Sequence, residues 1–129
     1  MLTIAIFTYK RLDALKKCLN SLDSDNISEI IIFNDNEEKK LSIEDITLTE
    51  NKTIKIEIYN PADFGFNDRS FRKPFYINQV FEISKNDYVL LSDDDGVFTK
   101  GAIDSHYNAL KKYPFCAGGI VRSKLFNKI

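Results

Sequence analysis

Three consecutive aspartates, Asp93, Asp94 and Asp95, are the residues in this sequence with the clearest capacity for chemistry. They follow residues 87–92 (DYVLLS), an apolar run that predicts a buried strand. Adjacent carboxylates repel one another, so we expect a positive partner to stabilise them. A divalent cation with oxygen ligands, Mg²⁺ or Mn²⁺, meets that need and typically shares a substrate phosphate. The cluster therefore predicts a metal and diphosphate site, with a solvated turn or helix cap as the structural alternative.

Polar residues also follow the first two predicted strands. Residues 2–9 (LTIAIFTY) and 29–33 (EIIIF) are rich in β-branched residues, as buried strands are. The first strand ends at Thr8 and Tyr9, and the second runs into the turn NDN, which contains Asp35. The Tyr9 ring suits stacking on a nucleobase, unless it only closes the core. The Asp35 carboxylate can accept a hydrogen bond from a base or a ribose, unless it is an ordinary turn residue.

A basic group, Arg69, Arg72 and Lys73, precedes a helix that Pro74 is well placed to open. Guanidinium and ammonium groups pair well with phosphate, so the group is a candidate for binding a diphosphate. The alternative is a solvated helix start. The single histidine, His106, lies within a predicted helix without a partner motif, so we expect a structural or exposed role for it.

Helical periodicity alternates with the strands. Residues 11–22 (RLDALKKCLNSL) space their leucines three and four apart, which predicts a helix with one apolar face. Residues 53–59 (TIKIEIY) alternate as a half-buried strand does. Residues 41–52 are expected to form a loop with a turn of helix, and residues 60–70 a loop broken by proline and glycine. Beyond the aspartates we expect a helix from a Thr99 cap to Lys112, then a last strand at 115–121 (FCAGGIV).

The helix that Pro74 opens is expected to pack through a face made of Ile77, Val80, Phe81 and Ser84. The resulting order of strands and helices predicts an α/β fold with a mostly parallel, Rossmann-like sheet flanked by helices. Ligands bind such sheets at the carboxyl ends of the strands. We therefore expect the polar residues at the strand ends to meet at one edge of the sheet.

Composition limits the function. A net charge of −1 over 129 residues gives no electrostatic basis for binding nucleic acid. No G-x-G-x-x-G follows the first strand and no G-x-x-x-x-G-K occurs, which disfavours a dinucleotide enzyme and a P-loop. Two distant cysteines, Cys18 and Cys116, indicate reduced thiols. With no signal-peptide pattern and no membrane-spanning run, we expect a cytoplasmic protein, with docking on the inner membrane surface left open.

Four segments resemble glycosyltransferase family 2, whose members have the GT-A fold, and they occur in the family's order. Residues 3–22 (TIAIFTYKRLDALKKCLNSL) are similar to its strand, Thr-Tyr-Asn-Arg turn and leucine-rich helix. Residues 29–38 (EIIIFNDNEE) resemble its acidic turn, and residues 60–70 (NPADFGFNDRS) its asparagine–proline–glycine loop. Residues 77–96 (INQVFEISKNDYVLLSDDDG) resemble the block that ends in its metal-binding Asp-x-Asp motif.

The resemblance implies a donor site for a nucleotide-diphospho-sugar, commonly UDP-linked, with Mg²⁺ or Mn²⁺. The base and ribose would be lined by Thr8, Tyr9 and Arg11, with Asp35 bonded to the base. The diphosphate or sugar would lie near Arg69 or Arg72 and Asn78. Asp93 and Asp94 would meet ribose and sugar hydroxyls, and Asp95, with Asp93, would hold the metal. The sequence departs from the family pattern at Lys10 (usually Asn), Asn34 (usually Asp) and Ile77 (commonly Arg).

The resemblance also implies hexosyl transfer to a glycan or lipid-linked acceptor. Residues 1–129 are expected to form one GT-A-like donor-binding domain, without the C-terminal acceptor half that family members carry. That half supplies the general base in inverting members, so no catalytic residue is assigned here, and a partner chain is a candidate to supply it.

Three alternatives remain open from the sequence. The first is a nucleotide-sugar-binding module without transfer activity. The second is a haloacid-dehalogenase-like phosphatase, because DDDGVFT is similar to its first motif, with Asp93 as nucleophile and Asp95 as acid/base. That motif normally opens its domain, whereas here it comes late in the chain. The third, a response-regulator receiver, needs acidic residues directly after the first strand, where this chain has Thr8, Tyr9 and Lys10.

Overall fold

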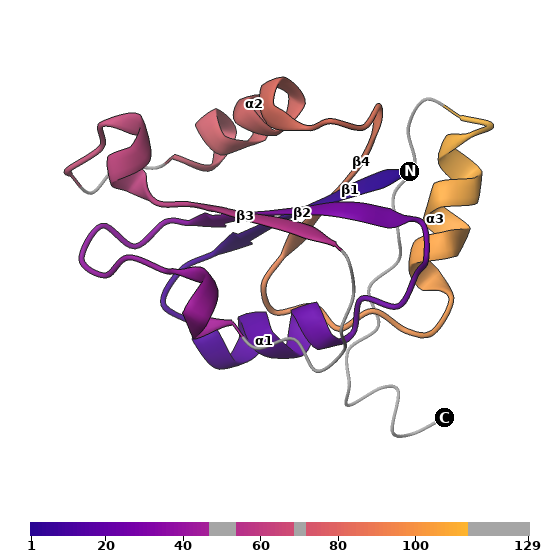
Figure 1. The fold of residues 1–129 in the computed structure, drawn as a ribbon, viewed down its shortest axis with the longest axis horizontal. Helices are drawn as coiled ribbons and strands as arrows, with labels where there is room; N and C mark the ends of the chain where they lie inside the picture. The colour runs from indigo at the N-terminus through magenta and orange to yellow at the C-terminus, as the bar shows by residue number, and fades with distance from the viewer. Residues whose placement is uncertain (47–53, 69–71, 114–129) are drawn as a thin grey trace.

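The computed structural model describes residues 1–46, 54–68 and 72–113 (Figure 1). Helices and strands alternate along the chain in the predicted order. The described elements are β1 (Leu2–Thr8), α1 (Leu12–Asn20), β2 (Ile27–Asn34), the 3₁₀ turn η1 (Ile43–Asp45), β3 (Lys55–Tyr59), the 3₁₀ turn η2 (Pro61–Phe64), α2 (Lys73–Ile83), β4 (Tyr88–Asp93) and α3 (Ala102–Leu110).

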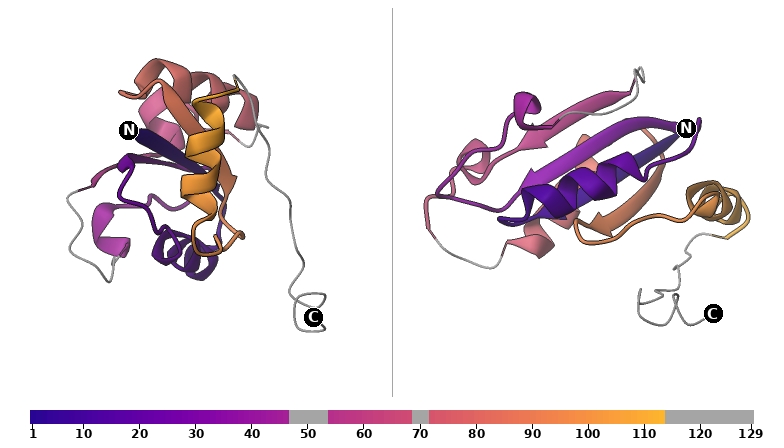
Figure 2. Two further views of the ribbon diagram at one scale, coloured as in Figure 1. Left: turned by 90° about the vertical axis from the view of Figure 1, so that its right-hand side faces the viewer. Right: turned by 90° about the horizontal axis from the view of Figure 1, so that it is seen from below.

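The four strands form one sheet in the order β3-β2-β1-β4, and every neighbouring pair is parallel. Helix α1 covers one face of the sheet and α2 the other, while α3 lies beside the start of β1 (Figures 1 and 2). This all-parallel sheet with flanking helices confirms the predicted α/β class. Because the strands are parallel, their carboxyl ends share one edge, and α1 and α2 both begin at that edge.

The central strand β1 is buried along its whole length because it lies between β2 and β4 and is covered on both faces. Its alternating side chains divide the core into two clusters. Leu2, Ile4 and Ile6 pack on the face covered by α1, together with residues of α3. Ala5 and Phe7 pack on the face covered by α2. The continuous apolar run at residues 2–9 predicted a buried strand of this kind, and β1 confirms it.

The leucine stripe of α1 is confirmed, since Leu15 and Leu19 are buried in the first core cluster. The predicted face of α2 is partly wrong. Val80 is buried, but its partner on the packing face is Tyr76, and Phe81 is 65% exposed. Tyr76 and Val80 are one helical turn apart and face Phe33 of β2, whereas Phe81 is rotated by about 100° from Val80 and points outward.

The predicted Thr99 cap is also wrong. Helix α3 begins at Ala102 and ends at Leu110, and its N-cap is Gly101 in the left-handed region (φ 80°). Glycine reaches that conformation without a Cβ clash, so the chain turns into the helix there. The predicted last strand at 115–121, with Cys116, lies outside the described residues. Within the described ranges, no helix is long and apolar enough to cross a membrane.

Candidate functional site

The register of the sheet brings three strand ends together. Thr8 is the partner of Asn34 across β1 and β2, and Phe7 is the partner of Asp93 across β1 and β4. The backbone N–H of Asp35 donates to the carbonyl of Thr8 at 2.9 Å, which extends the ladder beyond the end of β2. The predicted polar residues of β1, β2 and β4 therefore lie along one edge, where parallel sheets bind ligands.

Asp94 is the buried member of the aspartate cluster, with 0% of its surface exposed. Its Oδ2 accepts a hydrogen bond from the Thr8 hydroxyl at 2.8 Å. Its Oδ1 lies 2.6 Å from Nη2 of Arg11, within ion-pair distance but outside the angles of a hydrogen bond. A buried carboxylate is stable only when it is paired. Thr8 and Arg11 therefore fix Asp94 at the junction of β1, β4 and the start of α1.

Asp93 and Asp95 are exposed and face different cations of the chain. Nζ of Lys73, at the start of α2, lies 2.5 Å from Oδ1 of Asp93. Nη1 of Arg11, just before α1, lies 3.7 Å from Oδ2 of Asp95. The two carboxylates therefore pair with cations at the starts of two different helices. The repulsion expected within the cluster is thus relieved by ion pairs inside the protein.

The oxygen donors of this cluster suit Mg²⁺ or Mn²⁺ chemically. In the described part of the chain, however, no three His, Cys, Asp or Glu side chains are grouped to hold a metal ion. The arrangement fits a site in which one or two carboxylates bind the cation and phosphate oxygens and water complete the coordination. Asp94 is already engaged by Thr8 and Arg11, which leaves the exposed carboxylates of Asp93 and Asp95 as the candidate ligands.

Asp35 lies in a second network, on the face covered by α2. Its Oδ1 accepts hydrogen bonds from Nε of Arg72 and from the Tyr76 hydroxyl, both at 2.7 Å. Arg72 is 2% exposed, and its Nη2 also donates to Oε2 of Glu37 at 3.1 Å. Burial and the hydrogen bond to Asp35 raise the pKa of Tyr76 above its ordinary value, so the phenol keeps the proton that it donates. Arg72 therefore lies behind Asp35 and is not open to a phosphate.

The turn between β1 and α1 holds Tyr9 and Lys10. Tyr9 is half-buried, and Nζ of Lys10 lies 5.2 Å from the centroid of its ring. Lys10 also pairs with Glu38 at 3.2 Å, which joins this turn to the loop after β2. Its φ of 54° is in the left-handed region, and among the described non-glycine residues it alone has a positive φ. That region favours glycine and asparagine. This preference explains why an asparagine suits this position in the family pattern that the sequence resembles.

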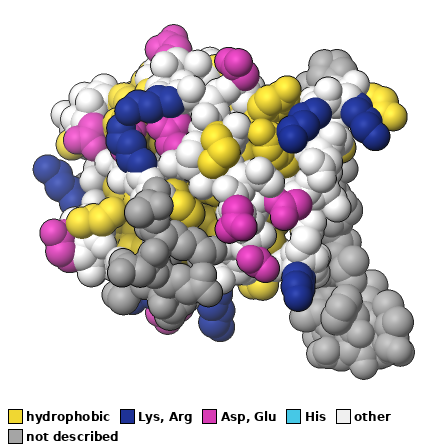
Figure 3. Space-filling view, turned by 45° about the vertical axis from the view of Figure 1, so that its right-hand side comes forward, with side chains coloured by type: hydrophobic (Ala, Val, Ile, Leu, Met, Phe, Trp, Pro, Cys, Tyr) yellow, Lys and Arg dark blue, Asp and Glu magenta, His cyan; other side chains and the backbone are white. Residues whose placement is uncertain are grey.

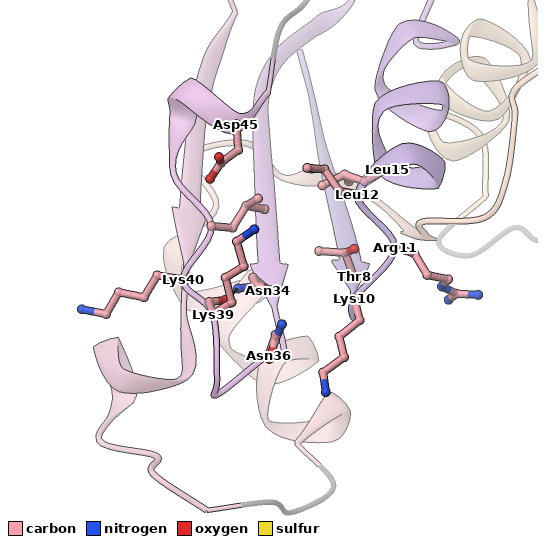
Figure 4. Close-up of a pocket in the computed structure, with 11 residues that line it drawn as sticks. Thr8, Lys10, Arg11, Leu12, Leu15, Asn34, Asn36, Lys39, Lys40 and Asp45 are labelled. Atoms are coloured by element: carbon pink, nitrogen blue, oxygen red, sulfur yellow. Dashed lines mark hydrogen bonds between the residues drawn. The ribbon is translucent and has the colours of Figure 1, made fainter.

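A cavity of about 290 Å³ opens between this turn and the loop after β2, on the face covered by α1 (Figure 4). Figure 4 shows the Lys39 side chain extending toward the space between β2 and α1, whereas Lys40 and Arg11 point away from it. Leucines form its apolar part, and its polar part combines lysines, asparagines and one carboxylate. The lining residues are Thr8, Lys10, Arg11, Leu12, Leu15, Asn34, Asn36, Lys39, Lys40, Leu41 and Asp45. The cavity shares Thr8 and Arg11 with the strand-end site, whereas Asp35 and the aspartate cluster do not line it.

Asn34 forms the polar floor of this region and is itself fixed by hydrogen bonds. Its amide nitrogen donates to Oδ1 of Asn60 at 2.8 Å and to the carbonyl of Lys39 at 3.0 Å. Asn60 also accepts from the N–H of Leu41 at 2.9 Å and donates to the Leu41 carbonyl at 3.1 Å. These contacts tie the end of β3 to the loop after β2, so the cavity wall is held by buried amides.

One predicted residue of the described chain does not join these networks. Asn78 lies on α2 with an exposed side chain, and no described contact links it to Asp35 or to the aspartates. Arg69 lies outside the described residues. Sequence reasoning missed Tyr76 and Glu37. Tyr76 follows Arg72 by four residues, which places both on one helix face, and this spacing was the available signal.

Figure 3 shows acidic and basic side chains interspersed over one face of the molecule, without a large patch of a single sign. This distribution agrees with the near-zero net charge.

Comparison with curated proteins finds no match for this chain. Comparison with protein families matches residues 3–128 to Glycosyl transferase family 2, which is nearly the whole sequence. The match includes both turns and the aspartate cluster at the sheet edge, so it agrees with the geometry of the site. A transferase that uses a nucleotide-sugar donor is the activity of this family in general terms, and the chain belongs to glycosyltransferase family 2.

Proposed function

We propose that this protein binds a UDP-linked sugar at the carboxyl edge of its sheet and transfers the hexose to a glycan or lipid-linked acceptor. The observation that carries the proposal is the meeting of Thr8, Asp35 and the aspartate cluster at that edge. A site for a nucleotide diphosphate would need two parts. One is a carboxylate that accepts a hydrogen bond from the base, and the other is an acidic cluster that faces the phosphates. The family match over residues 3–128 supports the reaction class.

In this proposal the base lies by Tyr9 and Asp35, and the ribose by Thr8 and Arg11. Tyr9 offers a flat ring for stacking, and Asp35 offers an acceptor oxygen. Asp93 and Asp95 lie where the diphosphate and sugar would follow, with Arg69 a proposed phosphate partner. Asn78, on α2, is a proposed contact to the diphosphate or sugar.

Mg²⁺ or Mn²⁺ bound by Asp95 and Asp93 would neutralise charge on the departing diphosphate. The residues of the chain bind and orient the donor. Lys73 now balances Asp93 at the surface, so its ammonium is close enough to turn toward phosphate oxygens when a donor arrives, whereas Arg11 stays paired with the buried Asp94.

Calorimetric titration with UDP, GDP, ADP and CDP, with and without Mn²⁺, tests the proposal. We expect UDP to bind more tightly with Mn²⁺ than without it. Asp95→Asn should remove the metal-dependent part of the affinity, because a neutral amide is a poorer ligand than a carboxylate. Asp25→Asn is the matched control, since Asp25 is exposed in the turn before β2, at the other end of the sheet.

Affinity that ignores both Mn²⁺ and Asp95→Asn would refute the metal site. Release of UDP from a UDP-sugar, followed over time, then separates a transferase from a binding module. Binding without turnover, even after partner chains are added, would favour the module. Release of phosphate from simple phosphomonoesters would instead support the phosphatase alternative.

A further inference from the structure

We propose that Arg72 and Tyr76 are positioning residues that orient Asp35, so that its second oxygen selects a nucleobase with a ring N–H, such as uracil. The inference rests on the proposed function, since it concerns how the donor's base is recognised. It assigns Arg72 a role other than binding phosphate. It also assigns a role to Tyr76, one helical turn beyond Arg72.

The two oxygens of Asp35 have different surroundings. Oδ1 accepts two hydrogen bonds at 2.7 Å, from Nε of Arg72 and from the hydroxyl of Tyr76. Among the described residues, no donor contacts Oδ2. The side chain is 28% exposed, so solvent or a ligand can reach it. One oxygen is therefore anchored and the other is presented at the sheet edge.

Arg72 is held from several sides, which makes it a rigid anchor. Its Nη2 donates to Glu37 at 3.1 Å and to the Asp35 carbonyl at 3.4 Å. Its Nη1 donates to the carbonyl of Asp68, and its guanidinium carbon lies 5.4 Å from the centroid of the Phe66 ring. A planar guanidinium held in this way keeps a fixed orientation, and little rotamer freedom remains to be lost when a ligand binds.

Tyr76 is held equally firmly. Its ring stacks on Phe33 of β2 with the centroids 5.0 Å apart, and the residue is 2% exposed. The hydroxyl therefore has a fixed position relative to the strand from which Asp35 projects. Because Asp35 N–H is also bonded to Thr8, both the backbone and the carboxylate of Asp35 are fixed before a ligand arrives.

An ionised carboxylate only accepts hydrogen bonds. Its outward oxygen would pair with the N3–H of uracil, whereas the N3 of cytosine carries a lone pair and would face it unfavourably. A site that fixes such an acceptor discriminates strongly against a ligand without the matching donor. The structure thus predicts that base selection depends on the anchoring pair as well as on Asp35 itself.

Titration with UDP, CDP and N3-methyl-UDP, which lacks the ring N–H, tests this inference in the full chain. Tyr76→Phe removes one anchor and keeps the ring, so we expect UDP affinity to fall roughly 3–10-fold. Arg72→Gln should reduce UDP affinity by more than tenfold, and Arg72→Lys should restore part of it. N3-methyl-UDP affinity should stay within about twofold in every variant, because that ligand cannot use the Asp35 oxygen.

Tyr107→Phe is the control. Tyr107 is a buried tyrosine of α3, and its hydroxyl accepts a hydrogen bond from the N-terminal ammonium of Met1. This variant should change neither the affinity for UDP nor the affinity for N3-methyl-UDP. If Arg72→Gln does not fold, Tyr76→Phe and Arg72→Lys decide the question. Equal loss of UDP and N3-methyl-UDP affinity in Tyr76→Phe, or no loss of either, would overturn the inference and leave the proposed function standing. Failure of the wild-type protein to bind any nucleotide would overturn both.

Discussion

Removing Arg11 should destabilise the fold far more than removing Lys73, although both side chains neutralise aspartates of the same cluster. We compare Arg11→Met with Lys73→Met, because methionine keeps an unbranched side chain and removes the charge. The Asp94 partner of Arg11 is 0% exposed, whereas Lys73 and Asp93 are both largely in solvent. The two variants therefore contrast a buried with an exposed carboxylate within one site.

The magnitude follows from burial. Breaking a fully buried ion pair by removing one partner costs roughly 3–5 kcal/mol. Arg11 itself is 53% exposed, so water can reach Asp94 Oδ1 once the guanidinium is gone, and Thr8 still donates to Oδ2. We therefore expect a loss of about 2 kcal/mol for Arg11→Met. Exposed pairs contribute about 0–1 kcal/mol, which is the expected range for Lys73→Met.

Thermal unfolding followed by circular dichroism measures the difference. For a domain of this size, about 2 kcal/mol corresponds to a fall in Tm of roughly 8 °C, and Lys73→Met should lie within a few degrees of the wild type. High salt should reduce any effect of Lys73→Met and leave that of Arg11→Met, because buried pairs are screened less. Equal Tm values for the two variants would refute the claim that Asp94 depends on Arg11.

Three further results are expected. Lys10→Gly should be more stable than Lys10→Ala by about 0.5–1 kcal/mol in urea denaturation, since φ is 54° there and both variants lose the same ammonium; the reverse order would argue against a left-handed Lys10. Asn60→Ala should cost roughly 2–4 kcal/mol, because it strips hydrogen bonds from the buried Asn34 amide and from both backbone groups of Leu41; a loss below about 1 kcal/mol in the same assay would contradict this. Burial raises the pKa of the Cys18 thiol from 9.0 to about 11, so the folded state holds this proton more tightly than the unfolded state. Its contribution to stability should be complete below pH 9 and be lost between pH 9 and pH 11, and Cys18→Ala should show a flatter pH profile than the wild type.

The sequence alone determined the order of elements and the edge at which the site lies. Apolar runs at 2–9 and 29–33 and the leucine spacing of 11–22 are local patterns, and they predict strands and a helix without knowledge of partners. Parallel strands place their carboxyl ends together, so the meeting of Thr8, Asp35 and Asp93 followed from topology. The family resemblance also came from local motifs, and the match over residues 3–128 confirms it.

The pairing of charges was decided only by the tertiary structure. The sequence shows three equivalent aspartates, but packing buries Asp94 against Thr8 and Arg11 and leaves its neighbours exposed. Asp93 is the last residue of β4 and pairs with Lys73 of α2, whereas Asp94 and Asp95 follow the strand and both meet Arg11, just before α1. Similarly, nothing local distinguishes Arg72 as a phosphate ligand from Arg72 as an anchor for Asp35.

Helix faces and caps depended on tertiary contacts in the same way. Phe81 is as apolar as Val80, yet only Val80 meets the sheet, because the axis and rotation of α2 are set by Tyr76 packing on Phe33. Gly101, and not Thr99, is the N-cap of α3, because the chain enters the helix through a positive φ at that residue. Periodicity fixes which residues share a face, whereas the angle at which that face meets its neighbour is a property of the assembled core.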